Sequence, residues 1–143
     1  MALPFPENSF DAAVMALVIF FVPEPAKGVA EMARVVVPGG IVSAYSWDVP
    51  GGGRPDALVE AEMRAVGVKP LRPPKADAAR IDTLRELWTG AGLQGVETRE
   101  ISVRRTFASF DDFWTTTLLG GNVGPAIAAM SSGDAETIKM RVR

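Results

Sequence analysis

The chain of 143 residues is long enough for one ordinary domain, and its 48% of hydrophobic and 22% of charged residues are typical of globular proteins. A formal net charge of −2 argues against a nucleic-acid partner, which requires a basic surface. Neither cysteine nor histidine occurs, which excludes disulfides, thiolate nucleophiles and the commonest metal ligand, so we expect no metal site. A cysteine-free chain fits a cytoplasmic location, and the apolar run at residues 12–22 is too short to cross a membrane.

The chain opens on the stretch LPFPENSFDAAVMALVIFFV, which predicts a turn followed by a buried strand. Two prolines, an asparagine and a serine within residues 3–9 favour the turn. Residues 12–20 are apolar without alternation, which is typical of a strand that is buried on both faces in a parallel sheet. A buried helix would also suit this run, but Pro23 and Pro25 close it too early for one.

A helix and a second strand follow. Pro25 suits the first position of a helix, and Pro38-Gly39-Gly40 is expected to end it. Between them, apolar residues recur at helical spacing: Ala26, Val29, Met32, Ala33 and Val36. Residues 41–47 then predict a strand, so residues 1–47 form a strand–helix–strand unit with parallel strands.

The rest of the chain predicts mostly helix. Residues 48–79 are a connector with a Gly-rich loop, three prolines near its end and one helix, and residues 80–143 complete a single truncated domain over 1–143. The alternation in residues 96–105 predicts a third strand with one wetter face. The expected helices are 57–66, 80–91, one capped by Ser109 or Asp111 and running to Leu119, 124–130 and 134–141. The fold class is therefore α/β, with a short, mostly parallel sheet of about three strands flanked by helices.

At this point the sequence resembles a known family. The stretch LPFPENSFD, the apolar strand after it, PEPAKGVAEMARVVVPGG and IVSAYSW are similar to the second half of class I S-adenosylmethionine-dependent methyltransferases, in the small-molecule group that includes the ubiquinone and menaquinone enzymes. That family carries E-x-x-R-V-L-x-P-G-G, and its positions are matched by Glu31, Arg34, Val35, Pro38, Gly39 and Gly40. RIDTLRELWTGAGLQGVET resembles the family's last helix and sixth strand, so the resemblance covers roughly residues 2–105.

The resemblance implies a partial Rossmann-like methyltransferase fold that uses S-adenosylmethionine. The family builds most of its cofactor site from a preceding half, with a Gly-rich loop and acidic residues, so the resemblance implies that this cofactor-binding N-terminal half is missing. Among the residues present, Ala2 and Leu3 match the edge of the adenine pocket, and Met15, Ala16 and Leu17 match the wall beside the methionine part of the cofactor. Packing in a strand core is the competing interpretation of these last three residues.

The substrate side of the site is implied by the same resemblance. Five residues at or beyond the strand ends match the place where the family accepts its substrate: Phe20, Phe21, Tyr45, Trp47 and Asp48. Aromatic side chains there could line an apolar pocket, although ordinary core packing is the alternative. Asp48 is the carboxylate best placed to act as a base, and a solvated loop position is its alternative. No catalytic residue is assigned.

Two functions remain open at this point. One is methyl transfer from S-adenosylmethionine to a small, apolar or aromatic molecule, which depends mainly on proximity and orientation and suits a site without histidine or cysteine. The other is a catalytically inactive fragment that persists by pairing strands in a homodimer, because the first strand would leave an open apolar edge. We expect a small-molecule methyl acceptor and a homo-oligomer, with no nucleic acid and no membrane as partners.

Overall fold

The computed structural model describes residues 2–143, and their contacts divide the chain into two compact units. Unit 1 comprises Met1–Gly52 and Pro73–Glu100, and unit 2 comprises Gly53–Arg72 and Ile101–Arg143. The single domain that the sequence predicts, with subdivisions at residues 47 and 79, stays a prediction, and each unit is described by itself.

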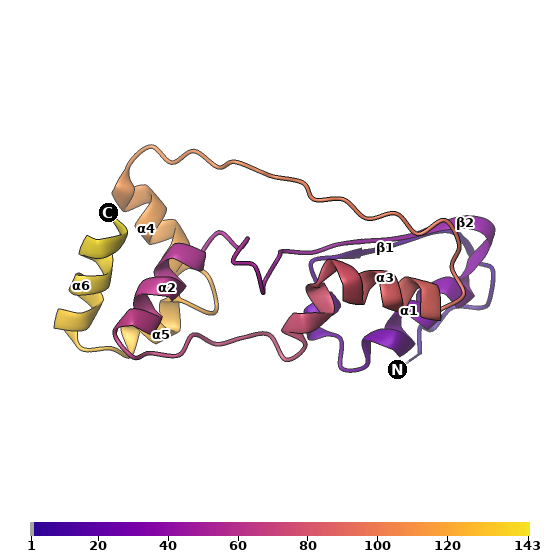
Figure 1. Ribbon diagram of the computed structural model, residues 1–143, viewed down its shortest axis with the longest axis horizontal. Helices are drawn as coiled ribbons and strands as arrows, with labels where there is room; N and C mark the ends of the chain where they lie inside the picture. The colour runs from indigo at the N-terminus through magenta and orange to yellow at the C-terminus, as the bar shows by residue number, and fades with distance from the viewer. Residues whose placement is uncertain (1) are drawn as a thin grey trace. The chain divides into compact units, whose positions relative to one another are not determined.

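Unit 1 is a two-stranded parallel sheet with helices. Its elements are β1 (Phe10–Ala16), the 3₁₀ helix η1 (Ile19–Phe21), α1 (Pro25–Val35), β2 (Val36–Tyr45), the 3₁₀ helix η2 (Ala76–Ala79) and α3 (Ile81–Gly90) (Figure 1). The α/β class and the strand–helix–strand unit are confirmed, and Pro25 occupies the first turn of α1 as predicted. A parallel pair requires a crossover connection, which α1 provides.

β2 begins earlier than the sequence predicts. We expected Pro38-Gly39-Gly40 to end the helix, but α1 ends at Val35 and these residues lie within β2. They occupy a shift in register, because Phe10 pairs with Val36 whereas Ala12 pairs with Ile41. Gly40 is required there, since a Cβ atom on it would lie 2.6 Å from the backbone oxygen of Asp11.

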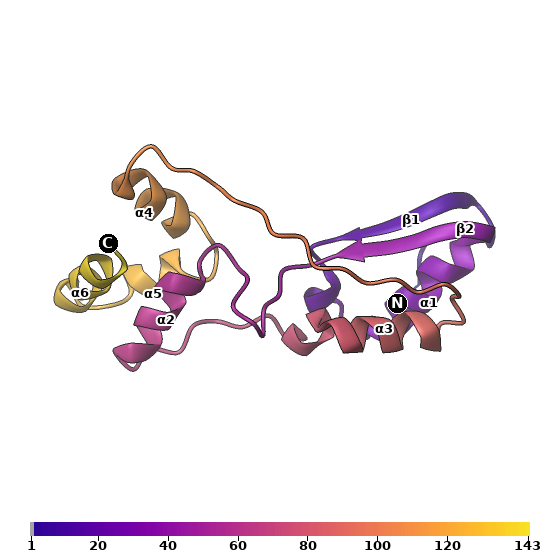
Figure 2. The same cartoon turned by 45° about the horizontal axis from the view of Figure 1, so that its top comes forward.

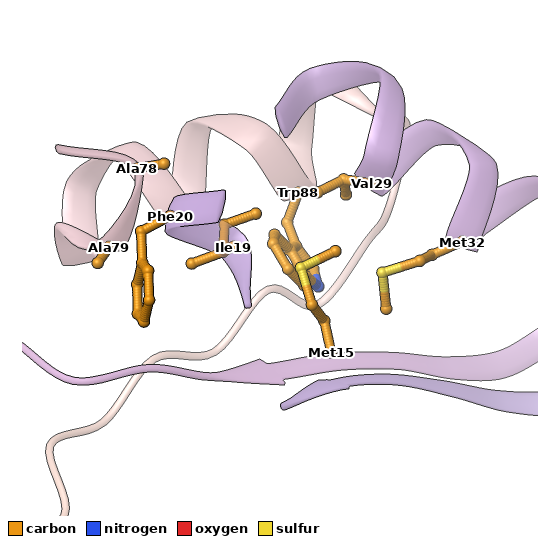
Figure 3. Close-up of a cluster of buried hydrophobic side chains, with 8 residues drawn as sticks. All are labelled: Met15, Ile19, Phe20, Val29, Met32, Ala78, Ala79 and Trp88. Atoms are coloured by element: carbon orange, nitrogen blue, oxygen red, sulfur yellow. The ribbon is translucent and has the colours of Figure 1, made fainter. Parts of the chain in front are cut away.

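The core of unit 1 lies between the sheet and the two helices. Figure 3 shows Met15 projecting from β1 toward Val29 and Met32 of α1 and Trp88 of α3. Ile19 and Val29 are fully buried, and burying a side chain of this size contributes about 1.5–3 kcal/mol. The indole Nε1 of Trp88 also donates a 2.9 Å hydrogen bond to the carbonyl of Val42 in β2, so α3 is joined to the sheet by a polar contact as well as by packing.

β1 is shorter than predicted. The strand ends at Ala16 rather than at Phe20, and residues 19–21 form η1. The cause is Leu17, whose φ of +56° lies in the left-handed region and turns the backbone out of the strand.

The expectation that this strand is buried on both faces is wrong as well. Both helices lie on one side of the sheet, as Figure 2 shows, so the residues of the other face are open. Val14 is 62% exposed and Ile41 is 65% exposed on that face. The sheet of unit 1 therefore has an apolar core on one face only, the face that the helices cover.

The third strand that the sequence predicts is absent from the described part of the chain. Residues 96–105 are neither strand nor helix, and the sheet has the order β1-β2. Alternation of side chains gives a strand only where another strand supplies the backbone hydrogen bonds, and no such partner lies beside these residues among residues 2–143.

Unit 2 is helical. It contains α2 (Ala57–Ala65), α4 (Phe110–Leu118), α5 (Gly124–Ala128) and α6 (Ser132–Val142). Their apolar faces share one core: Val59, Met63, Trp114, Val123, Ile127 and Ile138. Ser109 caps α4 as predicted, because its hydroxyl accepts a 3.1 Å hydrogen bond from the backbone N–H of Asp112. Across residues 2–143, every helix is too short or too polar to span a bilayer.

The contact between Trp88 and β2 gives a first prediction. The substitution Trp88→Phe leaves the carbonyl of Val42 without its partner in a partly buried position. It should lower the free energy of unfolding by about 1–3 kcal/mol more than packing loss alone, measured by urea unfolding followed by circular dichroism. Trp47→Phe is the matched control, because Trp47 packs against the same core and its indole has no hydrogen bond among the described residues. Equal losses in the two variants would contradict the role of the hydrogen bond.

Candidate functional site

The carboxyl ends of β1 and β2 meet at one edge of unit 1, and most of the sequence-predicted site residues lie there. Ala16 pairs with Tyr45, and the backbone N–H of Leu17 donates a 2.9 Å hydrogen bond to the carbonyl of Tyr45. Met15 is buried in the core, whereas Ala16 is exposed. The strand ends therefore present a small side chain and a backbone turn to the surface, next to Tyr45, which is 56% exposed.

The two adjacent phenylalanines of η1 have different environments. Phe20 is only 5% exposed and belongs to the core, while Phe21 is 57% exposed. Their rings meet edge to face with centroids 4.7 Å apart, so the buried ring holds the exposed one in place. The carbonyl of Phe20 also accepts a 3.0 Å hydrogen bond from the backbone N–H of Lys75. The sequence did not indicate this contact, which brings the irregular connector onto the strand end.

Trp47 and Asp48 follow β2 and play different structural roles. Trp47 is half-buried against the core of unit 1. Asp48 is exposed, and its Oδ1 accepts a 2.8 Å hydrogen bond from the backbone N–H of Gly51. Asp48 thus stabilises the turn of the Gly-rich loop with one carboxylate oxygen.

Ala2 and Leu3 are not hydrogen-bonded to the strand ends. The backbone N–H of Leu3 donates a 2.7 Å hydrogen bond to Glu31 Oε2, and the guanidinium of Arg34 donates to the carbonyls of Leu3 and Phe5 at 3.2 and 3.0 Å. Arg34 binds Glu31 at the same time through two bonds of 2.8 Å each. The first residues of the chain are therefore fastened to α1, a role that the three-residue spacing of Glu31 and Arg34 did not reveal.

This ion pair determines the protonation of its carboxylate. The hydrogen bond from Arg34, followed by the one from the backbone of Leu3, lowers the pKa of Glu31 from 4.5 to about 2. The same carboxylate raises the pKa of Arg34. Both groups are charged at neutral pH, so the attachment of residues 3–5 to α1 is complete there.

The chemistry available at the strand ends is apolar and aromatic, with one carboxylate. Among residues 2–143, no cluster of three or more acidic side chains has the arrangement needed to hold a metal ion. A shallow surface depression of this unit lies between α1 and α3 and is lined by residues such as Ala26, Ala30, Leu87 and Ala91. None of the predicted site residues lines it.

Comparisons with known proteins agree on the N-terminal part of the chain. Residues 1–44 match a family model described as a methyltransferase domain. The demethylmenaquinone methyltransferase of Renibacterium salmoninarum is 49% identical over 47 residues, which are 32% of this chain and 20% of that protein. The enzyme of the same name from Desulfitobacterium hafniense is 52% identical over 42 residues, which are 29% of this chain and 17% of that protein. The resemblance to class I methyltransferases is confirmed by these matches.

A longer match reaches beyond this part. An uncharacterised protein of Mycobacterium bovis is 30% identical over 133 residues, which are 90% of this chain and 46% of that protein. The chain thus spans less than half the length of each of these relatives. No solved structure matches the chain.

The ion pair of Glu31 and Arg34 gives a second prediction. The folded pKa of Glu31 is depressed, so its contribution to stability is complete above pH 4.5 and disappears as the pH falls toward about 2. Glu31→Gln should therefore lower the melting temperature at neutral pH, and the difference from the unsubstituted chain should shrink below about pH 4.5. Circular dichroism melts across this pH range provide the measurement.

The control for this prediction is Glu24→Gln. Glu24 pairs with Lys27 at the same three-residue spacing, but both side chains are more than half exposed. An exposed pair of this kind contributes little, so the variant should melt like the unsubstituted chain at each pH. A difference for Glu31→Gln that stays constant down to pH 2 would contradict the prediction.

Proposed function

We propose that this chain, which carries a class I methyltransferase-like domain, contributes the methyl-acceptor side of an S-adenosylmethionine-dependent methyltransferase that acts on a small molecule. The observation that supports this most is the position of the predicted residues at one edge of the sheet. Ligands of α/β sheets bind beyond the carboxyl ends of parallel strands, and Ala16 and Tyr45 lie next to each other at those ends.

The residues present are suited to one wall of a cofactor site. Ala16 is exposed and small, so it leaves room for a ligand to approach the backbone, and Leu17 turns the chain away immediately after it. The N–H of Leu17 is already bonded to Tyr45, so this wall offers contact surface rather than a free donor. S-adenosylmethionine, when bound, supplies an electrophilic methyl group on sulfur.

The chain's own residues would then position the acceptor. Tyr45 exposes more than half of its side chain at the end of β2, and Phe21 does so in η1, five residues beyond the end of β1. Aromatic faces at such a position bind apolar or aromatic molecules and exclude water from the reacting atoms. Orientation of the nucleophile toward the methyl carbon is the main contribution that such a site makes to the rate.

The proton of the acceptor must leave when the new bond to carbon forms. This chain has no histidine or cysteine, so among its own residues a carboxylate is the candidate to take this proton. Asp48 is the carboxylate at the end of β2, and its Oδ2 is not used in the hydrogen bond to Gly51. We assign Asp48 the role of proton acceptor for acceptors with an acidic hydroxyl.

The acceptor class follows from the same surface. Two relatives are named for the methylation of demethylmenaquinone, and an aromatic acceptor of that chemical type suits the exposed rings of Phe21 and Tyr45. The alternative of a catalytically inactive fragment has no support from the comparisons.

The test is methyl transfer by this chain from radiolabelled S-adenosylmethionine to demethylmenaquinone and to simpler quinols and phenols. Tyr45→Ala removes an aromatic contact at the strand end and should raise the KM for the acceptor about tenfold, with a smaller change in the KM for S-adenosylmethionine. Asp48→Asn should lower kcat and leave the KM for the acceptor nearly unchanged.

The control is Ile41→Ala. Ile41 lies on the same open face of β2, is 65% exposed, and is four residues from the strand end. The variant Ile41→Ala also removes an exposed apolar side chain, but away from the strand end. It should therefore leave the KM values for the acceptor and for S-adenosylmethionine unchanged. If calorimetry detects no binding of demethylmenaquinone or of the simpler quinols and phenols to the folded chain and no acceptor is methylated, the proposal is wrong.

A further inference from the structure

We propose that Arg54 fixes the position of α2 along its neighbouring helices in unit 2, by binding Asn122 in the turn between α4 and α5. Unit 2 is assembled from two stretches of chain, residues 53–72 and residues 101–143, and α2 packs beside α6 of the second stretch (Figure 2). This inference does not depend on the proposed methyl transfer.

The connections of the chain do not determine where α2 lies along these helices. α4, α5 and α6 follow one another through short turns, whereas residues 66–109 separate α2 from α4 and include the last part of unit 1. A long connection restricts the positions of its two ends only weakly. The position of α2 must therefore be set by contacts within unit 2.

The apolar contacts of α2 are compatible with more than one position. Val59 and Met63 are fully buried in the core of unit 2, and Val66 packs against that core. These residues recur once per helical turn, so a slide of one turn, about 5.4 Å, brings Met63 to the place of Val59 and Val66 to the place of Met63. Apolar burial is non-directional, so it discriminates only weakly between the two positions.

The buried guanidinium of Arg54 supplies a directional contact. Its side chain is charged and yet only 9% exposed. Asp56 Oδ2 lies 2.5 Å from Nη2 of Arg54, and Glu60 Oε1 lies 3.3 Å from Nη1. Both carboxylates belong to the same stretch of chain as Arg54, so they compensate its charge and hold the planar guanidinium in one orientation.

The contact with Asn122 joins this guanidinium to the second stretch. In the amide orientation that satisfies both groups, the side-chain oxygen of Asn122 accepts from both terminal nitrogens of Arg54. The turn that carries Asn122 is tight, because a Cβ atom on Gly124 would lie 1.9 Å from the carbonyl oxygen of Leu118. A slide of α2 by one turn would break this contact, since side-chain hydrogen bonds are lost beyond about 3.5 Å.

The other charged contact between the two stretches in the described part of the chain is weaker. Arg141 Nη1 lies 3.6 Å from Glu62 Oε2, and the side chain of Arg141 is 52% exposed. An exposed ion pair of this kind contributes little. A buried guanidinium that loses an acceptor is costly by comparison, so the contact between Arg54 and Asn122 is the one that selects the position of α2.

The test compares two substitutions of Asn122 in the full chain. Asn122→Leu is similar in size but offers no acceptor, so α2 should populate more than one position. Asn122→Asp keeps an acceptor oxygen for Arg54, so α2 should keep one position. The measurement is the NMR resonance of the Met63 methyl group, in protein labelled with ¹³C at the methionine methyls and assigned with Met63→Leu.

The number and width of Met63 resonances report the position of α2. We expect one sharp resonance for the unsubstituted chain and for Asn122→Asp. We expect two resonances, or one broadened by exchange on the μs–ms timescale, for Asn122→Leu. Asn122→Ala, which also removes the acceptor and adds no bulk to the turn, takes the place of Asn122→Leu if that variant does not fold.

Arg54 and Arg64 provide a matched pair of variants. Both contact Glu60, but Arg64 lies 3.6 Å from it and its side chain is 56% exposed. Arg54→Met leaves the buried carboxylates of Asp56 and Glu60 without their partner and should lower the melting temperature by about 10 °C or more. Arg64→Met should leave both the melting temperature and the Met63 resonance unchanged.

Three results would overturn the inference. The first is a single sharp Met63 resonance, at an unchanged chemical shift, in the variant that lacks the acceptor at position 122. The second is the same multiplicity of Met63 resonances in Asn122→Asp as in that variant. The third is a melting temperature of Arg54→Met that equals the melting temperature of Arg64→Met.

Discussion

The parallel pairing of β1 and β2 is the constraint on which unit 1 depends. Parallel strands cannot be joined by a tight turn, so the chain must cross over through α1, and this places one helix against the sheet. The same geometry brings both carboxyl ends to one edge, where Ala16 and Tyr45 are neighbours. The candidate site is thus a consequence of strand direction, and the side chains around it add specificity to an edge that already exists.

Much of this arrangement is encoded locally and could be predicted from the sequence. Pro25 begins a helix because its fixed φ and missing N–H suit the first turn, and Ser109 caps a helix because its hydroxyl reaches a free backbone donor. The left-handed conformation of Leu17 could not be predicted, since leucine has no preference for it. It is supported by the N–H bond to Tyr45, a residue 28 positions later in the sequence.

Non-local contacts explain the other differences. Glu31 and Arg34 form a pair that the helical spacing predicts, but their bonds to Leu3 and Phe5 connect residues about 30 positions apart. The alternation in residues 96–105 is typical of a strand. A strand also requires a partner strand, and alternation alone does not identify one. Local sequence therefore predicts which helices and strands form. Long-range hydrogen bonds determine where they begin and end and what they contact.

The two kinds of open apolar surface in this chain have different physical requirements. The outer face of the sheet, with Val14 and Ile41, needs only another apolar layer, because the backbone between β1 and β2 is already paired. That requirement is non-directional and selects no particular partner. Residues 97–105 need backbone hydrogen bonds as well as apolar contact, and these bonds fix direction and register. Strand pairing therefore selects its partner more strictly than the outer face of the sheet does.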